Sequence, residues 1–96
     1  MITEKDFTRI NGDIYGNPRY VFHFLHLITL EEMEEGTIDS HYQKALKRAK
    51  NIGGRKFHNK QYGGGIVITT YSLQEYITRI NNLMEKVRDN NEDGSI

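Results

Sequence analysis

Two apolar stripes at helical spacing, each behind a capping signal, constrain this fold more than any other feature. Ser40-His41-Tyr42-Gln43 and Ser72-Leu73-Gln74-Glu75 have the S-x-x-[QE] form of a capping box, which satisfies free amide groups where a helix begins. Apolar residues then recur at the i, i+3, i+4 and i+7 positions of an amphipathic helix. The stripes consist of Tyr42, Ala45, Leu46, Ala49 and Ile52, and of Leu73, Tyr76, Ile77, Ile80, Leu83, Met84 and Val87. Two packed helices are therefore predicted.

The segment before the first helix predicts a β-hairpin over residues 6–28. Both Asn11-Gly12-Asp13 and Gly16-Asn17-Pro18 are turn signals, and we favour the second as the main turn. Tyr20 to Ile28 is largely apolar on both faces, which predicts a central strand covered on at least part of both sides. The acidic connection from Glu31 to Thr37 has room for a helical turn, but we interpret it as a loop.

A second pair of strands is predicted between the two helices. Gly53-Gly54 suits a helix end, because glycine readily adopts the left-handed conformation there. Arg55 to Tyr62 and Ile66 to Tyr71 follow as strands joined at Gly63-Gly64-Gly65, and the second has the richest β composition in the chain.

The element order is then ββαββα, which predicts an α+β fold with a four-stranded, mainly antiparallel sheet and both helices packed on one face. The other face should be open to a partner. Residues 1–89 are expected to form a single domain and residues 90–96 a disordered polar C-terminal tail. The predicted core includes Tyr42, Leu46, Ala49, Ile66, Ile68, Tyr76, Ile77 and Ile80.

Composition excludes several classes of protein. The chain has 96 residues and no cysteine, so disulfides, thiol nucleophiles and zinc ribbons are excluded. Met1 to Asp6 lacks the basic start and apolar run of a signal peptide. Tyr20 to Leu30, the longest apolar stretch, is too short to span a bilayer. We expect a cytoplasmic protein.

The net charge of zero hides two segments of opposite sign. Residues 31–39 hold five acids and no base, whereas residues 40–62 hold seven bases and no acid. Cations interspersed with histidine and tyrosine are what a phosphate backbone with stackable bases requires. The predicted nucleic-acid-binding residues are Lys44, Lys47, Arg48, Lys50, Arg55, Lys56, His58, Lys60 and Tyr62. The alternative is a solvated helix face beside a sheet edge protected by lysines.

Metal binding, a phosphate loop and catalysis have less support in the sequence. His23 and His26 would lie on opposite faces of a strand, and no cysteine–histidine or HExxH spacing exists, so we expect no metal and no cofactor. The glycines at 63–65 lack the pattern of a phosphate loop. No catalytic triad is recognisable. A small metal-independent nuclease built on His58 is chemically conceivable, but we predict that the protein is not an enzyme.

Three segments resemble those of small accessory proteins carried by phages, plasmids and integrative elements. They are residues 9–20 (RINGDIYGNPRY), 53–58 (GGRKFH) and 62–67 (YGGGIV). The resemblance covers about residues 6 to 80 and implies a context rather than a site. Such proteins often bind nucleic acid or disable a host defence complex. A nucleic-acid-binding protein is our first expectation, an inhibitor of a host CRISPR or restriction protein the second, and the nuclease the third.

Overall fold

Four short strands form one antiparallel sheet in this computed structural model, which describes residues 1–57 and 64–90. The elements are β1 (Thr8–Ile10), β2 (Arg19–His23), α1 (Leu30–Met33), α2 (Ile38–Asn51), β3 (Arg55–Phe57), β4 (Gly65–Thr69) and α3 (Leu73–Asn90), with 3₁₀ turns η1 (Glu4–Asp6) and η2 (Phe24–Leu27). The strand order is β1-β2-β4-β3, and each neighbouring pair is antiparallel. The predicted α+β fold is confirmed.

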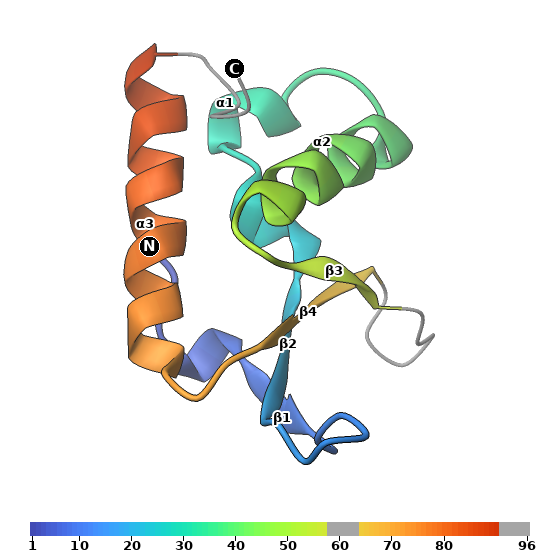
Figure 1. The fold of residues 1–96 in the computed structure, drawn as a ribbon. Helices are drawn as coiled ribbons and strands as arrows, with labels where there is room; N and C mark the ends of the chain where they lie inside the picture. Colours follow the sequence, from blue (N-terminus) through green and yellow to red (C-terminus); the bar gives the residue numbers. More distant parts are fainter. Residues whose placement is uncertain (58–63, 91–96) are drawn as a thin grey trace.

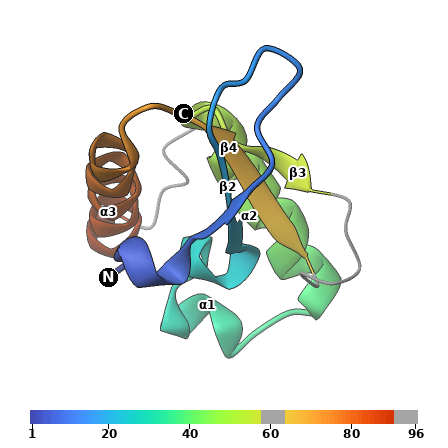
Figure 2. The same cartoon turned by 90° about the horizontal axis from the view of Figure 1, so that it is seen from below.

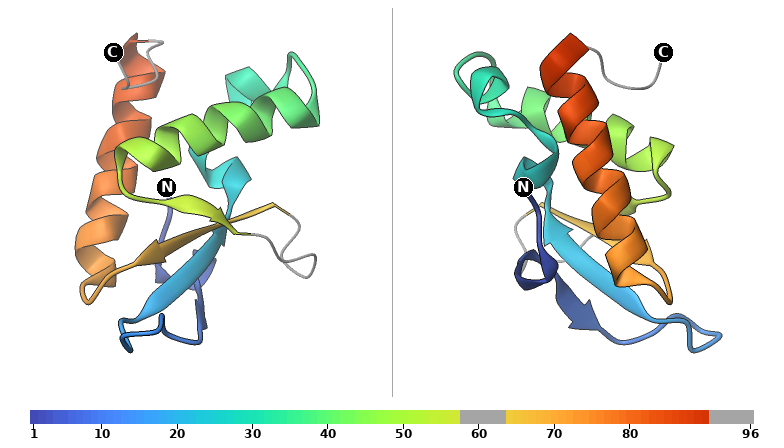
Figure 3. Two further views of the ribbon diagram at one scale, coloured as in Figure 1. Left: turned by 45° about the vertical axis from the view of Figure 1, so that its right-hand side comes forward. Right: turned by 90° about the vertical axis from the view of Figure 1, so that its left-hand side faces the viewer.

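Both long helices pack on one face of this sheet (Figures 1 and 3). Phe22 pairs with Ile66 across β2 and β4, and both are buried in the cluster that contains Ala45 and Ala49 of α2. Because side chains alternate along a strand, the residues between them face the opposite way. That opposite face has no long helix over it and turns toward the viewer in Figure 2. The prediction of one covered face and one open face is confirmed.

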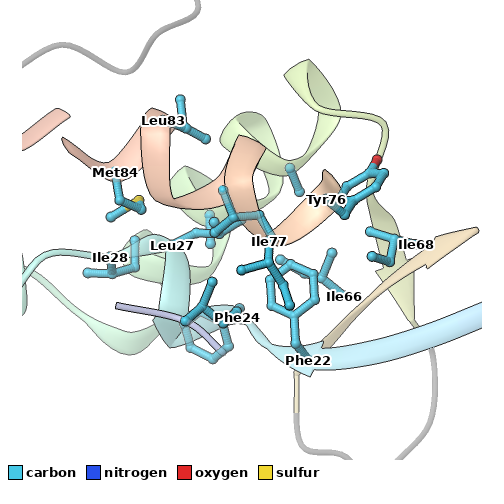
Figure 4. Packing of buried hydrophobic residues seen from close by; sticks show 14 of the residues in the cluster. Phe22, Phe24, Leu27, Ile28, Ile66, Ile68, Tyr76, Ile77, Leu83 and Met84 are labelled. Atoms are coloured by element: carbon cyan, nitrogen blue, oxygen red, sulfur yellow. The ribbon is translucent and has the colours of Figure 1, made fainter. Parts of the chain in front are cut away.

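The core joins the sheet to the apolar stripe of α3 (Figure 4). Ile80 is completely buried, and Ile77 packs close to Phe22 and Ile66. Full burial of such a side chain stabilises the fold by about 1.5–3 kcal/mol. All eight predicted core residues lie in this cluster or against it, Tyr42 and Leu46 being only partly buried.

The predicted strand from Tyr20 to Ile28 is wrong in its second half. Regular strand ends at His23, and the 3₁₀ turn η2 follows, held by a 3.2 Å hydrogen bond from Leu25 N–H to His23 Nδ1. A continued strand would direct half of its apolar side chains to the open face. With three residues per turn, η2 instead brings Phe24 and Leu27 to the same side, where both are buried.

Two helix starts also differ from the prediction. Residues 30–33 form α1 rather than loop, because Thr29 and Glu32 exchange the two hydrogen bonds of a capping box. The next helix, α2, begins at Ile38, two residues after Gly36, which has a φ of 84°.

 Thr37, which stands between Gly36 and Ile38, is the N-cap of α2. The Thr37 hydroxyl accepts a 3.1 Å hydrogen bond from Ser40 N–H. Ser40 was predicted as the cap, but it supplies the returning half of the box through its own hydroxyl.

The predicted start of α3 is confirmed. The hydroxyl of Ser72 accepts a 3.3 Å hydrogen bond from Glu75 N–H, and the helix begins at the next residue. The first hairpin turns earlier than predicted, because Gly16 N–H donates to the carbonyl of Asp13 and Gly16 has a φ of 81°. Asp13 also accepts from Tyr15 N–H and Asn17 N–H, so one carboxylate organises the whole connection.

Two predicted features lie outside the described residues. These are residues 58–63, which hold the rest of the strand predicted from Arg55 to Tyr62 and the first of the three turn glycines, and the tail from residue 91 onward. The end of α2 is described: Gly53 has a φ of 85°, as predicted for a helix end, and the Tyr76 hydroxyl donates to the carbonyl of Ile52. Across residues 1–57 and 64–90, no helix has the length and apolar character needed to cross a membrane.

Candidate nucleic-acid interface

Six of the nine predicted nucleic-acid-binding residues lie in the described part of the chain. Lys44, Lys47, Arg48 and Lys50 are on α2, and Arg55 and Lys56 are on β3. The other three, His58, Lys60 and Tyr62, lie outside the described residues.

Arg48 is not a surface residue, and its assignment to the basic surface is wrong. Its side chain is 1% exposed. Its guanidinium donates to both carboxylate oxygens of Glu32, at 2.8 and 2.7 Å, and to the carbonyl of Leu27 at 2.7 Å. Such a bidentate pair is a strong, geometrically specific contact. A phosphate cannot reach this guanidinium while Glu32 holds it.

Lys44 belongs to the same internal contact. Its ammonium lies 3.1 Å from Glu32 Oε2, and its side chain is 40% exposed. Burial by itself raises the pKa of the Glu32 carboxyl, but the hydrogen bonds from Arg48, from Thr29 N–H and from Lys44 outweigh burial and hold this pKa far below its usual value. Glu32 is therefore ionised, and it neutralises much of the charge that α2 was predicted to offer.

The sequence contains a signal for the position of Glu32. Thr29-Leu30-Glu31-Glu32 is itself a T-x-x-E capping box, which predicts a helix start and fixes Glu32 beside the first turn of α1. Its partner Arg48 lies sixteen residues further on, at no periodic spacing. The capping role of Glu32 was thus predictable, but its counter-ion was not.

The exposed cations that remain are divided between two faces. Lys47 and Lys50 lie on the solvent side of α2. On β3, Lys56 pairs with Ile66 and so turns toward the helices, where its ammonium lies 5.4 Å from the ring centre of Tyr42. Arg55 pairs with Val67 and turns toward the open face. Strand alternation therefore separates the two neighbouring cations of β3.

Arg19 adds a cation that sequence reasoning missed. It pairs with Thr69 across β2 and β4, so it shares the open face with Arg55. A cleft of about 520 Å³ lies beside these residues and is lined by Asp13, Arg19, Gly53, Arg55, Lys56, Val67 and Thr69. Two of these cations, Arg19 and Arg55, share the open face with one carboxylate there. Hydrogen bonds from Asn17 lower the pKa of Asp13, so its charge is retained and the cleft has a net positive charge.

Two rings lie on the same open face, in the cross-strand row next to the row that contains Arg55 and Val67. Phe57 pairs with Gly65, and Gly65 pairs with His23. His23 is exposed and stacks on Phe24, with ring centres 4.8 Å apart, whereas Phe57 is half-buried. Cations beside flat side chains on an uncovered sheet can contact phosphates and bases together.

The histidines do not gather into a metal site in the part of the chain that is described. Residues 1–57 and 64–90 contain no group of three His, Asp or Glu side chains placed to hold an ion. His26 is in the turn η2 and not in a strand, and its Nε2 lies 3.8 Å from Asp6 Oδ1.

The fold and its surface define a small α+β protein with an uncovered sheet face and a basic cleft at the sheet edge. Comparison of the sequence with protein families matches residues 2–92, and the chain belongs to the family described as Staphylococcus phage terminal repeat-encoded protein TreK. No curated protein and no solved structure matches the chain. The expected phage context is confirmed at the level of the family.

Proposed function

We propose that this phage protein binds nucleic acid, without acting as an enzyme, through the basic cleft and the open sheet face beside it. The observation that carries the proposal is the register of β2, β4 and β3. It aligns Arg19 with Thr69 in one cross-strand row and Arg55 with Val67 in the next.

The interface we propose differs from the one predicted from the sequence. Arg48 is excluded because it is buried, and Lys44 is directed to the Glu32 carboxylate that it shares with Arg48. Lys47 and Lys50 remain as exposed cations on α2, but this helix packs on the covered face of the sheet and not on the open face. Phosphates would contact Arg19 and Arg55, while His23 and Phe57 offer flat surfaces for bases.

Binding to single strands fits this geometry better than reading of a duplex. The two arginines proposed to contact phosphates lie on strands β2 and β3, not on a helix that could enter a major groove. An open sheet with rings and arginines suits unstacked bases, whose faces are accessible only in single-stranded segments.

Fluorescence anisotropy across a salt series tests the proposal, with single- and double-stranded DNA and RNA probes. We expect affinity to fall steeply with salt because each phosphate contact releases counterions. The double reversal R19E/R55E should weaken binding at least tenfold on every probe. K5E/K86E, which changes the net charge equally at exposed positions outside the cleft, is the matched control.

Two outcomes would reject the proposal. One is equal affinity of the wild type, R19E/R55E and K5E/K86E proteins for all four probes. The other is loss of intact probe during incubation with the wild type, since cleavage would favour the nuclease interpretation over simple binding.

A further inference from the structure

The first short helix forms an apolar ridge on a different part of the molecule. Leu30 of α1 is 82% exposed, Ile38 at the start of α2 is 68% exposed, and Met33 lies between them in the chain and is also exposed. We call Leu30, Met33 and Ile38 the α1 ridge. Leu30 and Met33 line one hollow beside α1, so a single partner can cover both side chains.

Hollows lie on both sides of α1. One, of about 550 Å³, lies between α1 and the first turns of α2 and is lined by Glu31, Glu32, Glu34, Glu35, Gly36, Ser40, His41 and Lys44. We call it the acidic hollow. The other, of similar volume, is more apolar and is lined by Met1, Leu25, His26, Ile28, Thr29, Leu30, Glu31, Glu32, Met33, Met84, Val87 and Arg88.

The charge around the ridge is strongly one-sided. Arg48 and Lys44 neutralise Glu32, but Glu31, Glu34 and Glu35 are exposed and make no ion pair among the described residues. Asp39 is likewise exposed at the start of α2. Any partner that covers the apolar ridge must therefore bring positive charge, and a phosphate backbone would be repelled.

His41 gives an independent indication that the acidic hollow binds a ligand. Its side chain is 7% exposed and lines the hollow, yet within residues 1–57 and 64–90 it makes no hydrogen bond. Neither ring nitrogen is among the fully buried side-chain atoms that lack a partner, so both are accessible in a side chain that is otherwise enclosed. A neutral imidazole has one nitrogen that accepts a hydrogen bond, which an ammonium or guanidinium can donate.

We propose that the α1 ridge and the acidic hollow dock a basic amphipathic segment of a protein partner. A lysine or arginine of that segment enters the hollow, where the glutamates and His41 accept its hydrogen bonds. Apolar residues of the segment cover Leu30, Met33 and Ile38. This surface lies apart from the nucleic-acid interface and has the opposite charge, so either can be lost without the other.

The test uses synthetic amphipathic helical peptides. The first, the lysine–leucine peptide, has lysines on one face and leucines on the other. The lysine–leucine peptide should bind, while a twin with glutamate in place of lysine and a twin with serine in place of leucine should not. E31K/E34K/E35K should weaken binding at least tenfold, and L30S/I38S several-fold. The matched control is E4K/E85K/D89K, three reversals at exposed positions that line neither hollow.

His41 supplies a second readout that does not depend on charge reversal. The ring ¹⁵N resonances of His41 should shift when the lysine–leucine peptide is added, and those of exposed His23 should not. His41→Phe, which keeps a buried ring but removes both nitrogens, should weaken binding. Equal loss of binding in E31K/E34K/E35K and in the control, or unchanged His41 resonances at saturation, would overturn the proposal. Unchanged melting temperatures establish that each variant is folded.

Discussion

Arg48 of α2 and Arg55 of β3 lie seven residues apart in the same run of bases, but they occupy opposite environments. Arg48 is 1% exposed and is held by Glu32 and the carbonyl of Leu27. Arg55 is exposed at the sheet edge beside a cleft. The difference comes from the neighbours that the fold supplies: a capped acidic turn packs over α2, whereas the open face of β3 has no such cover. A run of like charges therefore predicts neither exposure nor function for its individual members.

Substitution of Arg48 should have the largest effect on stability. Arg48→Ala leaves the Glu32 carboxylate without its main counter-ion and the Leu27 carbonyl without its donor, so we expect a loss of about 3–5 kcal/mol. Lys47→Ala, an exposed neighbour on the same helix, should stay within about 0.5 kcal/mol. Urea unfolding measures both changes. Equal, small losses would mean that Arg48 is a surface residue after all.

Acidification should break the same contact without mutation. The pKa of Glu32 in the folded protein lies well below its ordinary value of 4.5, so its ionised form stabilises the fold. This contribution is fully present above about pH 4.5 and is lost as the pH falls further. Glu32→Gln should lower stability at pH 7 and flatten the decline below pH 4.5, as measured by thermal melting across pH. A variant whose acid sensitivity matches the wild type would show that other carboxyls dominate.

The cap of α2 gives a smaller effect and separates the predicted cap residue from the observed one. Thr37→Ala removes the hydroxyl that accepts from Ser40 N–H, and N-cap truncations cost about 1 kcal/mol, within a range of 0.5–2. Ser40→Ala removes the returning contact to Thr37 N–H, which is the lesser half of the box, and should cost less. Urea midpoints rank the two variants. The reverse ranking would favour Ser40 as the N-cap.

The sequence predicts the parts of this fold that follow from local periodicity. The apolar stripe of α3, the burial of Ile66 and Ile68, and the glycine that ends α2 are all confirmed. It fails at residues 24–27, because an apolar run by itself does not distinguish a strand from a 3₁₀ turn. Pairs of residues far apart in the chain are the hardest to predict. Neither the Arg48–Glu32 contact nor the alignment of Arg19 with Thr69 corresponds to a periodic spacing in the sequence.

Arg55→Ala should have the smallest effect on stability and so complete the comparison with Arg48. Arg55 is exposed, and a surface substitution of this kind changes the free energy of unfolding by less than about 0.5 kcal/mol. Its effect should appear in binding instead. If Arg55 contacts one phosphate, its removal should weaken affinity on all sequences and reduce the slope of log affinity against log salt by about one. Anisotropy titrations at several salt concentrations measure this slope, with Lys86→Ala as the matched control on α3. Arg48→Ala, measured where it remains folded, should leave the slope unchanged, because its guanidinium is committed to Glu32. An equal change of slope in the Arg55 and Arg48 variants would mean that exposure does not separate the two arginines in function.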